Sequence, residues 1–388
     1  TGFLVQNFIA KNLGNERYGF FGILQNDFMI FSAVADFGMA TLILAFFAKR
    51  ATQGKLFVNI LQLRFFASLF TAGLMFAFVF LVRRHHPIFF AELIMIPGLI
   101  LQHAFFDWYF TCASFWKKLL ISKILHTCSY ASIMAIALIY FRIESIEGIA
   151  LCMVLSALPA WAFGVSNAFN RKLFKFTKRT IKFIALMYKA ALPYALASLA
   201  SFAYLPAGLY FVDSFASSTY LSAYNFANKL IVLASGLMVH FISSSLISLH
   251  KTNDGKIHIK DQLLFFLFIA VVCLPIFLFP HKILQVLFFA APWTNEVLKA
   301  SSEILQLLTL SLLFQAIRLP YISMLLKEKQ VWKYVSFIAI GGLCNIIGCF
   351  LGISFYGVEK TALFVLSGEI VFTAILAYDA FRQKKYAF

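Results

Sequence analysis

The stretch NILQLRFFASLFTAGLMFAFVFLV, residues 59–82, decides the fold class of this chain. Arg64 is its only charged residue, and the run is long enough to cross a bilayer, because a spanning helix needs about 20 apolar residues. The apolar residues are continuous, whereas the strands of a membrane β-barrel would show short alternating runs. A lipid-exposed segment must also satisfy its backbone hydrogen bonds internally. We therefore predict a transmembrane helix here.

Similar apolar runs fill the rest of the chain. Of its 388 residues, 62% are hydrophobic and 13% are charged, and the mean hydropathy is +0.85. A soluble chain has about 25% charged residues, so this composition excludes a soluble globular protein. Besides 59–82, the predicted spans are 18–47, 88–116, 119–141, 148–169, 184–212, 220–249, 263–289, 301–326, 331–355 and 360–381, and residues 1–10 are the end of one more.

The charge distribution predicts the orientation in the membrane. The chain has 33 basic and 16 acidic residues, a net charge of +17. The loops on one side carry 21 basic residues and those on the other carry 8. The richer side is cytoplasmic by the positive-inside rule, and the C-terminus lies on it. The densest basic run, Arg171 to Lys182, is read as a linker at anionic headgroups, and no nucleic-acid partner is expected.

An internal repeat divides the chain in two. Residues 18–27, YGFFGILQND, resemble residues 220–229, YLSAYNFANK, at a shift of 202. Both segments start on the outer side by the charge count, so the repeat is parallel, a known transporter arrangement. We expect an N-terminal lobe at 1–170, a basic cytoplasmic linker at 171–183 and a C-terminal lobe at 184–388. The same shift predicts that about 18 residues of the first helix precede Thr1.

Ionisable residues inside spans are costly in lipid and are candidate functional residues. Arg64 and Lys189 lie near the cytoplasmic ends of their predicted spans. Their long side chains could extend to the lipid headgroups, which explains their position almost as well as a functional role does. Six others are deeper and are expected to face a water-filled interior or to form ion pairs, such as Asp27 with Lys229; they are Asp27, Asp36, Asp107, Lys229, Arg318 and Glu369. Asn225 lies one helical turn before Lys229 and shares its face.

The sequence lacks the motifs of common enzymes. It has no GxxxxGK[ST], HExxH, GxSxG or CxxC. His103 and Asp107 are one turn apart, but no third ligand is apparent, so we expect a hydrogen-bonded pair rather than a metal site. The six cysteines lie in apolar runs and are expected to be core residues. No metal, cofactor or catalytic residue is expected, and a transporter fits better than an enzyme.

Short motifs occur in an order that resembles a transporter family. They are Leu13–Gly19 (LGNERYG), Ala35–Met39 (ADFGM), Phe47–Arg50 (FAKR), Asp107–Phe110 (DWYF), Asp213, Ser222–Tyr224 and Asn228–Leu230, followed by Asn345, Gly357 and Glu369. Together they resemble the Wzx-type polysaccharide flippases of the MATE-like multidrug/oligosaccharidyl-lipid/polysaccharide (MOP) superfamily. Thr111 stands where this family often has Gln, and Ser222 where it usually has Gly.

The resemblance implies an all-α integral membrane protein with a twelve-helix MATE-like fold, its first helix truncated, whose two six-helix lobes surround a central cavity. It implies flipping of polyprenyl-pyrophosphate-linked oligosaccharide repeat units across the cell inner (cytoplasmic) membrane, for a surface polysaccharide such as lipopolysaccharide O-antigen. The expected partners are this substrate, membrane lipids, a polysaccharide polymerase with its chain-length machinery, and H+ or Na+ as coupling ion. The residues expected to bind substrate are Lys229, Arg318, Asn225, Asp36, Asp27, Asp107, Glu369, Arg64 and Lys189.

Two other functions are open at this point. A MATE-type multidrug or cation antiporter would have the same fold and an acid-dominated cavity. Lys229 and Arg318 favour an anionic substrate, whereas the four buried acids keep the antiporter open. An O-antigen polymerase or ligase would need a larger outer loop than any predicted here.

Overall fold

The computed structural model describes residues 2–42, 54–103, 107–112, 115–170, 181–202, 205–251, 259–327, 330–357 and 360–382. Across these ranges the chain is helical with short turns, and they contain no β-strand. The motif at Phe47–Arg50 and most of the predicted linker at 171–183 lie outside the described residues. The chain folds into two compact units, Thr1–Leu199 (unit 1) and Ala200–Phe388 (unit 2).

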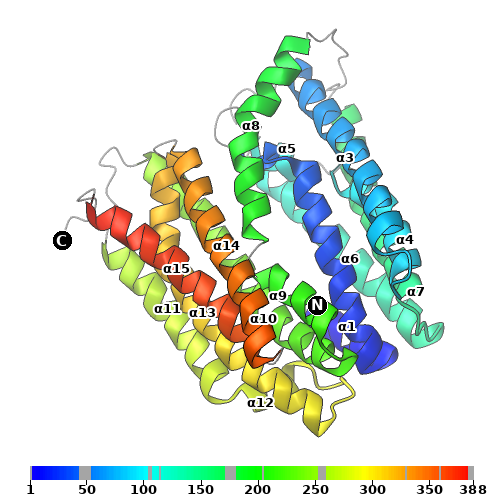
Figure 1. Ribbon diagram of the computed structural model, residues 1–388. Helices are drawn as coiled ribbons and strands as arrows, with labels where there is room; N and C mark the ends of the chain where they lie inside the picture. Colours follow the sequence, from blue (N-terminus) through cyan, green and yellow to red (C-terminus); the bar gives the residue numbers. More distant parts are fainter. Residues whose placement is uncertain are drawn as a thin grey trace. The chain divides into compact units, whose positions relative to one another are not determined.

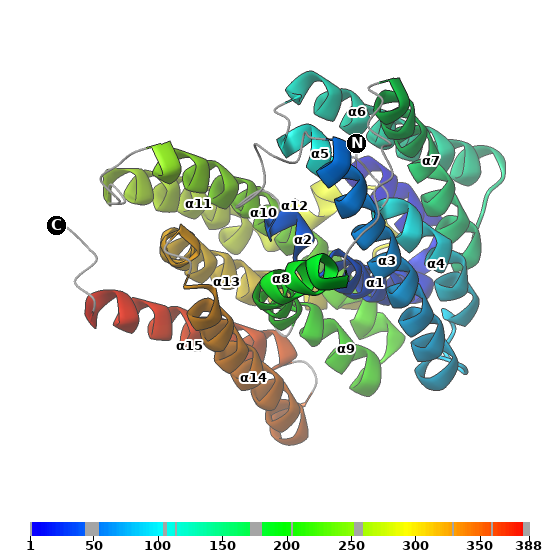
Figure 2. The ribbon, with the colours of Figure 1, turned by 90° about the horizontal axis from the view of Figure 1, so that it is seen from above.

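Unit 1 contains the helices of the first half of the chain (Figure 1). They are α1 (Gly2–Asp36), α2 (Met39–Leu42), α3 (Gly54–Val82), α4 (Phe89–His103), α5 (Asp107–Cys112), α6 (Trp116–Ala135), the π-helical turn η2 (Ile136–Tyr140), α7 (Ile146–Asn170) and most of α8 (Ile181–Ser201). In this unit α4 packs between α3 and α7, as both views show (Figures 1 and 2).

Unit 2 contains the remaining helices. They are α9 (Leu205–Phe215), α10 (Ser218–Lys251), α11 (Ile259–Leu278), α12 (Pro280–Leu287), α13 (Asn295–Lys327), α14 (Val331–Tyr356) and α15 (Thr361–Arg382). Helix α13 is central, because it packs against α10, α11 and α15. Helix α14 lies along α15 (Figure 2). Their contact is close, because a Cβ added at Gly352 of α14 would overlap the Phe364 ring of α15.

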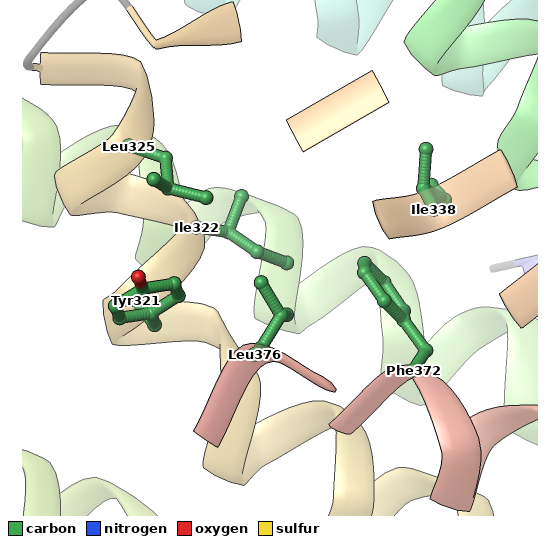
Figure 3. Close-up of a cluster of buried hydrophobic side chains, with 6 residues drawn as sticks. All are labelled: Tyr321, Ile322, Leu325, Ile338, Phe372 and Leu376. Carbon is green, nitrogen blue, oxygen red and sulfur yellow. The ribbon is translucent and has the colours of Figure 1, made fainter. Parts of the chain in front are cut away.

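The core of unit 2 includes a cluster drawn from three helices (Figure 3). Helix α13 contributes Tyr321, Ile322 and Leu325, helix α14 contributes Ile338, and helix α15 contributes Phe372 and Leu376. Helices in a membrane associate through close packing of side chains rather than through removal of apolar surface from water. The cluster packs α15 against α13 and α14 in this way.

The chain breaks its helices where the backbone demands glycine or proline. Gly14 has a φ of 72° and interrupts α1. It lies between the predicted end of a span at 1–10 and the predicted span at 18–47. Gly38, at φ 67°, separates α1 from α2, and its added Cβ would lie 2.6 Å from Tyr194 Cβ of α8. Only glycine tolerates such a backbone and such an approach without strain. Helix α8 thus packs against the end of α1, within unit 1.

The predicted single span at 263–289 is wrong in one respect. Its two parts, Phe266–Leu278 and Pro280–Leu287, are bent by 94°. Phe279 has non-helical torsions, and Pro280 starts α12. Proline has no backbone N–H and its ring clashes with the preceding turn, so it is tolerated at a helix start but ends a helix that precedes it.

Several of the described helices qualify as membrane spans by length and composition. Seven qualify, or eight if the bent pair counts as one. Helices α1, α8 with α9, and α10 occupy the predicted spans 18–47, 184–212 and 220–249 but are not among the seven found in the described residues. The other spans expose large apolar side chains, such as Phe70 at 67% and Phe355 at 78%. Such surfaces fit lipid rather than water, and the chain is a multi-pass membrane protein.

Candidate functional site

A buried ion pair joins two predicted site residues of unit 2. Arg318 on α13 donates from Nη1 to Oε2 of Glu369 on α15. The side chain of Glu369 is 1% exposed and that of Arg318 is 11% exposed. The pair lies in helices that qualify as spans. The side chain of Glu369 is thus enclosed, whereas that of Arg318 keeps a small exposed fraction.

Two further side chains brace this pair. Gln315, one turn before Arg318, donates from Nε2 to Oε1 of Glu369 at 3.1 Å. Its Oε1 accepts a hydrogen bond from Ser235 Oγ of α10 at 2.9 Å. The guanidinium carbon of Arg318 lies 4.6 Å from the ring centroid of Phe372, a cation–π distance. Both carboxylate oxygens of Glu369 therefore accept a hydrogen bond from α13.

Unit 1 contains a second pair of predicted site residues. Arg64 Nη1 on α3 donates to Asp36 Oδ1, at the end of α1, over 2.8 Å. The side chain of Arg64 is 8% exposed and that of Asp36 is 24% exposed. Arg64 is therefore a buried ion-pair residue, although its position near a helix end also suggested extension to the headgroups.

Asp27 belongs to a different group of charges. Its Oδ2 accepts a hydrogen bond from Arg83 Nη2 at 3.3 Å. Arg83 Nε lies 4.0 Å from Oε1 of Glu92, in the first turn of α4. All three side chains are buried. Within unit 1, Asp27 therefore shares the guanidinium of Arg83 with Glu92, and the pairing of Asp27 with Lys229 stays a hypothesis.

Asp107 forms an ion pair with a residue of α6. It begins α5, and its two oxygens accept hydrogen bonds from Ser122, at 3.0 Å, and Lys123, at 2.6 Å. The side chain of Lys123 is 62% exposed. One candidate span covers Phe89–Phe110 and includes Asp107, and the depth of Asp107 in the membrane stays a prediction. The partners that the structure shows for Asp107 come from α6, whereas we had expected His103.

The remaining candidates lie on two helices. On α10, Asn225 and Asn228 are buried and Lys229 is half-buried. Lys229 is one turn from Asn225, so the two share a face of the helix. Lys189 on α8 is exposed, which agrees with a side chain that extends to the headgroups.

Neither a metal cluster nor a deep cavity accompanies these residues in the described ranges. No group of three His, Cys, Asp or Glu side chains there is placed to hold a metal ion. One hollow of about 260 Å³ lies at the turn between α9 and α10 and contains none of the predicted site residues. Its lining residues are Phe215, Ala216, Ser217, Thr219, Tyr220, Glu296 and Ala300.

Comparison with known proteins identifies the family. A family model described as "Polysaccharide biosynthesis protein" matches residues 1–247. The chain belongs to this polysaccharide biosynthesis family. No curated protein matches its sequence.

Solved structures share the fold of this family member at low identity. A multidrug resistance MATE family transporter of the MOP superfamily, in an inward-facing conformation, matches with a TM-score of 0.78 at 12% identity, over 98% of this chain and 93% of that one. The lipid II flippase MurJ, in an inward closed conformation, matches with 0.77 at 15%, over 98% and 84%. A MOP superfamily transporter from Pyrococcus furiosus, described as having a binding pocket of reverse polarity, matches with 0.67 at 12%, over 98% and 91%. The predicted all-α MOP-type fold is confirmed, and the relatives are transporters and flippases rather than enzymes.

The motifs that carried the family resemblance have a structural explanation. Gly14, Gly38 and Gly357 belong to those motifs, and they are the glycines with positive φ in the described part of the chain. Each separates or ends a helix, and Gly357 follows the last residue of α14. A side chain would strain these turns, so these family glycines set where helices stop.

Sequence reasoning missed four of the residues in these buried groups. Arg83 was counted among the eight basic loop residues of the less basic side, yet it is buried whereas its neighbour Arg84 is exposed. Glu92, Gln315 and Ser235 were not considered. Glu92 and Gln315 interrupt apolar runs, a signal that would have marked them, because a polar side chain in a span needs a partner.

Proposed function

We propose that the protein flips polyprenyl-pyrophosphate-linked oligosaccharide repeat units across the cytoplasmic membrane by alternating access. The product would feed the synthesis of a surface polysaccharide, such as lipopolysaccharide O-antigen. The family match and the fold support a lipid-linked flippase or a MATE-type transporter. The choice between these two depends on the charge of the substrate.

The observation that carries the choice is the half-buried cation Arg318, whose side chain is 11% exposed, in a helix that qualifies as a membrane span. A diphosphate loses its hydration when it enters a low-dielectric site, at a cost that only compensating charge and hydrogen bonds can offset. A guanidinium offers both, since it can bind phosphate oxygens in a bidentate way. Lys229, on the same helix face as Asn225, supplies a second cation in the same unit.

We propose the following roles for the candidate residues. Arg318 and Lys229 bind the diphosphate, while the amide and the acids bind sugar hydroxyls or neighbouring cations. The full proposed set is Lys229, Arg318, Asn225, Asp36, Asp27, Asp107, Glu369, Arg64 and Lys189. Of these, Arg318 with Glu369 and Asp36 with Arg64 already form pairs.

The test is transport in reconstituted vesicles. Purified protein is placed in liposomes that contain a labelled polyprenyl-pyrophosphate oligosaccharide, and the label on each leaflet is measured with a membrane-impermeant lectin. We expect Lys229→Ala to abolish flipping while the protein still inserts normally, and Lys229→Arg to retain part of it, because the charge is kept. Full flipping by Lys229→Ala would remove this residue from the site.

A second candidate function is favoured by one observation. In unit 1 the carboxylates of Asp27 and Glu92 outnumber the guanidinium of Arg83, and an acid excess suits a cationic substrate. A MATE-type antiporter would expel a lipophilic cationic dye from the same vesicles when a proton or sodium gradient is applied. Dye transport without flipping of the lipid-linked glycan would select this alternative.

The proposed function also implies an orientation in the membrane and a set of partners. We propose a cytoplasmic-membrane protein with its C-terminus and the 171–183 linker in the cytoplasm, driven by H+ or Na+ and working with a polysaccharide polymerase and its chain-length machinery. The excess of basic residues on one side supports this orientation. Single cysteines at Lys175 and Lys384 should resist an impermeant thiol reagent in intact cells. Labelling of either from outside would reverse the orientation.

A further inference from the structure

We propose that the hollow at the turn between α9 and α10 of unit 2 binds a neutral sugar ring. Its volume is about 260 Å³, and its lining combines aromatic rings, hydroxyl groups and a carboxylate. It lies apart from the residues expected to bind the diphosphate, none of which lines it. The inference rests on the proposed function for the source of the sugar, which is the glycan of the lipid-linked substrate.

The frame of the hollow is fixed by the ends of three helices. Phe215 is the last residue of α9, and Ser217 lies directly before α10. The carbonyl oxygen of Ser217 accepts a hydrogen bond from the N–H of Leu221 at 3.0 Å, and its Oγ accepts one from the N–H of Tyr220 at 3.3 Å. Helix α13, which packs against α10, contributes Glu296 from its first turn. Hydrogen-bonded helix ends thus hold the lining in place, so the hollow is formed before a ligand arrives.

Small side chains provide the space in the hollow. Ala300 lies one helical turn after Glu296, so the two share a face of α13, and both line the hollow. Ala216, in the turn between α9 and α10, is another small lining residue. A larger side chain at position 300 would occupy this volume, and it would close the hollow while every polar lining group is kept.

The lining offers the groups that a sugar ring needs. One face of a sugar ring carries C–H groups, and the aromatic rings of Phe215 and Tyr220 present a negatively charged face to them. The edge of the sugar carries hydroxyls, which donate and accept hydrogen bonds. The carboxylate of Glu296 accepts from hydroxyls, while the hydroxyls of Ser217 and Thr219 can donate and accept. Phe215 and Glu296 are exposed, so a ligand can reach them.

The charges around the hollow favour a neutral ligand. Glu296 is the charged residue of the lining, and its carboxylate repels an anion such as a diphosphate. Another wall is the start of α10, a helix of 34 residues, whose N-terminus carries a partial positive charge that disfavours a cation. A hydroxyl suits both walls, because it can donate to the carboxylate and accept from backbone N–H groups at the helix start.

The position of the hollow relative to the membrane suits a glycan that leaves the protein. The candidate span of α13 runs from Asn295 to Ile322, so Glu296 lies at one end of it. In the proposed orientation, with the C-terminus in the cytoplasm, this is the outer end of the helix. A sugar bound there would lie at the outer membrane surface while the polyprenyl tail stays in the bilayer. The hollow therefore holds a sugar of the substrate on the outer side.

The experiment measures saccharide binding by saturation-transfer NMR titration of the whole protein in lipid nanodiscs. The neutral probes are glucose, galactose, N-acetylglucosamine and rhamnose, and the charged probes are glucuronate and tetramethylammonium. We expect at least one neutral sugar to bind with a Kd of about 1–10 mM, because a single ring offers few atoms for contact, and each charged probe to bind at least about tenfold more weakly. Ala300→Leu should abolish binding of the sugar, since it fills the hollow.

Matched variants locate the binding in the hollow. Phe215→Ala should weaken binding of the sugar about tenfold, whereas Phe215→Tyr should keep it. Phe279→Ala is the control, because Phe279 is also 55% exposed but does not line the hollow. Glu296→Gln should weaken binding of the neutral sugar and strengthen that of glucuronate, since the repelling charge is lost. Its control is Glu303→Gln, at an exposed acid of α13 outside the hollow, which should change neither.

Several outcomes overturn the inference. Absence of binding by every neutral sugar, unchanged binding in Ala300→Leu, or tighter binding of tetramethylammonium than of any sugar would each reject a saccharide site. In the vesicle assay Ala300→Leu should slow glycan flipping severalfold, and flipping at the wild-type rate would reject the assignment of the sugar to the transported glycan.

The two assays separate this inference from the proposed function. A wild type that flips the lipid-linked glycan but binds no neutral sugar would reject the inference alone. A wild type that binds a neutral sugar in the hollow but flips no glycan, and instead expels a cationic dye, would reject the proposed function and with it the source of the sugar.

Discussion

The buried arginines of the two units have different surroundings. In unit 1, Arg83 lies between two enclosed acids, Asp27 and Glu92. In unit 2, Arg318 pairs with Glu369, whose other oxygen accepts a hydrogen bond from Gln315. Arg83 thus lies beside two enclosed carboxylates, whereas the carboxylate described beside Arg318 is that of Glu369. We infer that Arg83 serves stability and Arg318 serves binding.

The largest expected effect on stability tests the structural role of Arg83. Arg83→Ala would remove the guanidinium that lies beside the enclosed carboxylates of Asp27 and Glu92, and should lower the free energy of unfolding by about 3–5 kcal/mol. Arg84→Ala is a matched control, because this neighbouring arginine is exposed, and should change it by less than about 0.5 kcal/mol. Thermal unfolding of the purified proteins in detergent gives both values. Equal losses from the two variants would contradict a structural role for Arg83.

This pair of arginines also shows where sequence reasoning stops. The spans could be predicted because apolar runs of sufficient length have one stable solution in lipid: α14 at Val331–Tyr356 matches the predicted 331–355. That Arg83 and not Arg84 is buried depends on Asp27 of α1 and Glu92 of α4, which are far apart in the sequence. That information lies in the packing and not in the local pattern.

The candidate site was predictable in part for a related reason. Charged residues in apolar runs are visible in the sequence, so both members of the pairs Asp36–Arg64 and Arg318–Glu369 were named. Their pairing was not, because helix register decides it. The partners of Asp107 could not be predicted either, since Ser122 and Lys123 come from α6 and not from its own apolar run.

The second effect compares the packing around one glycine of each unit, Gly208 in unit 2 and Gly73 in unit 1. A Cβ added at Gly208 of α9 would overlap the hydroxyl of Tyr224 on α10. Overpacking of this kind costs about 1–3 kcal/mol, so Gly208→Ala should destabilise the protein by that amount, and Tyr224→Phe should recover part of it. Gly73→Ala in α3 of unit 1 has open space around it and should be neutral or slightly stabilising. Melting temperatures of the three single variants and of the double variant provide the test; no recovery would show that the hydroxyl is not the obstacle.

A third, smaller effect concerns the ion pair between Asp36 and Arg64, whose carboxylate is partly exposed. Asp36→Ala leaves Arg64 buried, but water can reach the 24% exposed position of the carboxylate, so we expect a loss of only about 1–2 kcal/mol. The exchange Asp36→Arg with Arg64→Asp should restore most of this stability because the ion pair re-forms. Glycan flipping should stay impaired, since a guanidinium at position 36 cannot accept hydrogen bonds from sugar hydroxyls. Restored flipping would place the pair among the structural charges, with Arg83.

The smallest effect concerns the most exposed ion pair, between Asp107 and Lys123. With Lys123 62% exposed, the pair is screened by water and contributes about 0–1 kcal/mol, so Lys123→Gln should barely change the melting temperature or the rate of flipping. Asp107→Asn keeps the size of the side chain and an oxygen that can accept from Ser122, and should also fold normally. If Asp107 binds sugar hydroxyls through its charge, this variant should slow flipping severalfold while Lys123→Gln does not. Flipping at the wild-type rate in both variants would make Asp107 a headgroup-level ion pair, and binding of the glycan would then rest on Asp36 and on the amide and cations of unit 2.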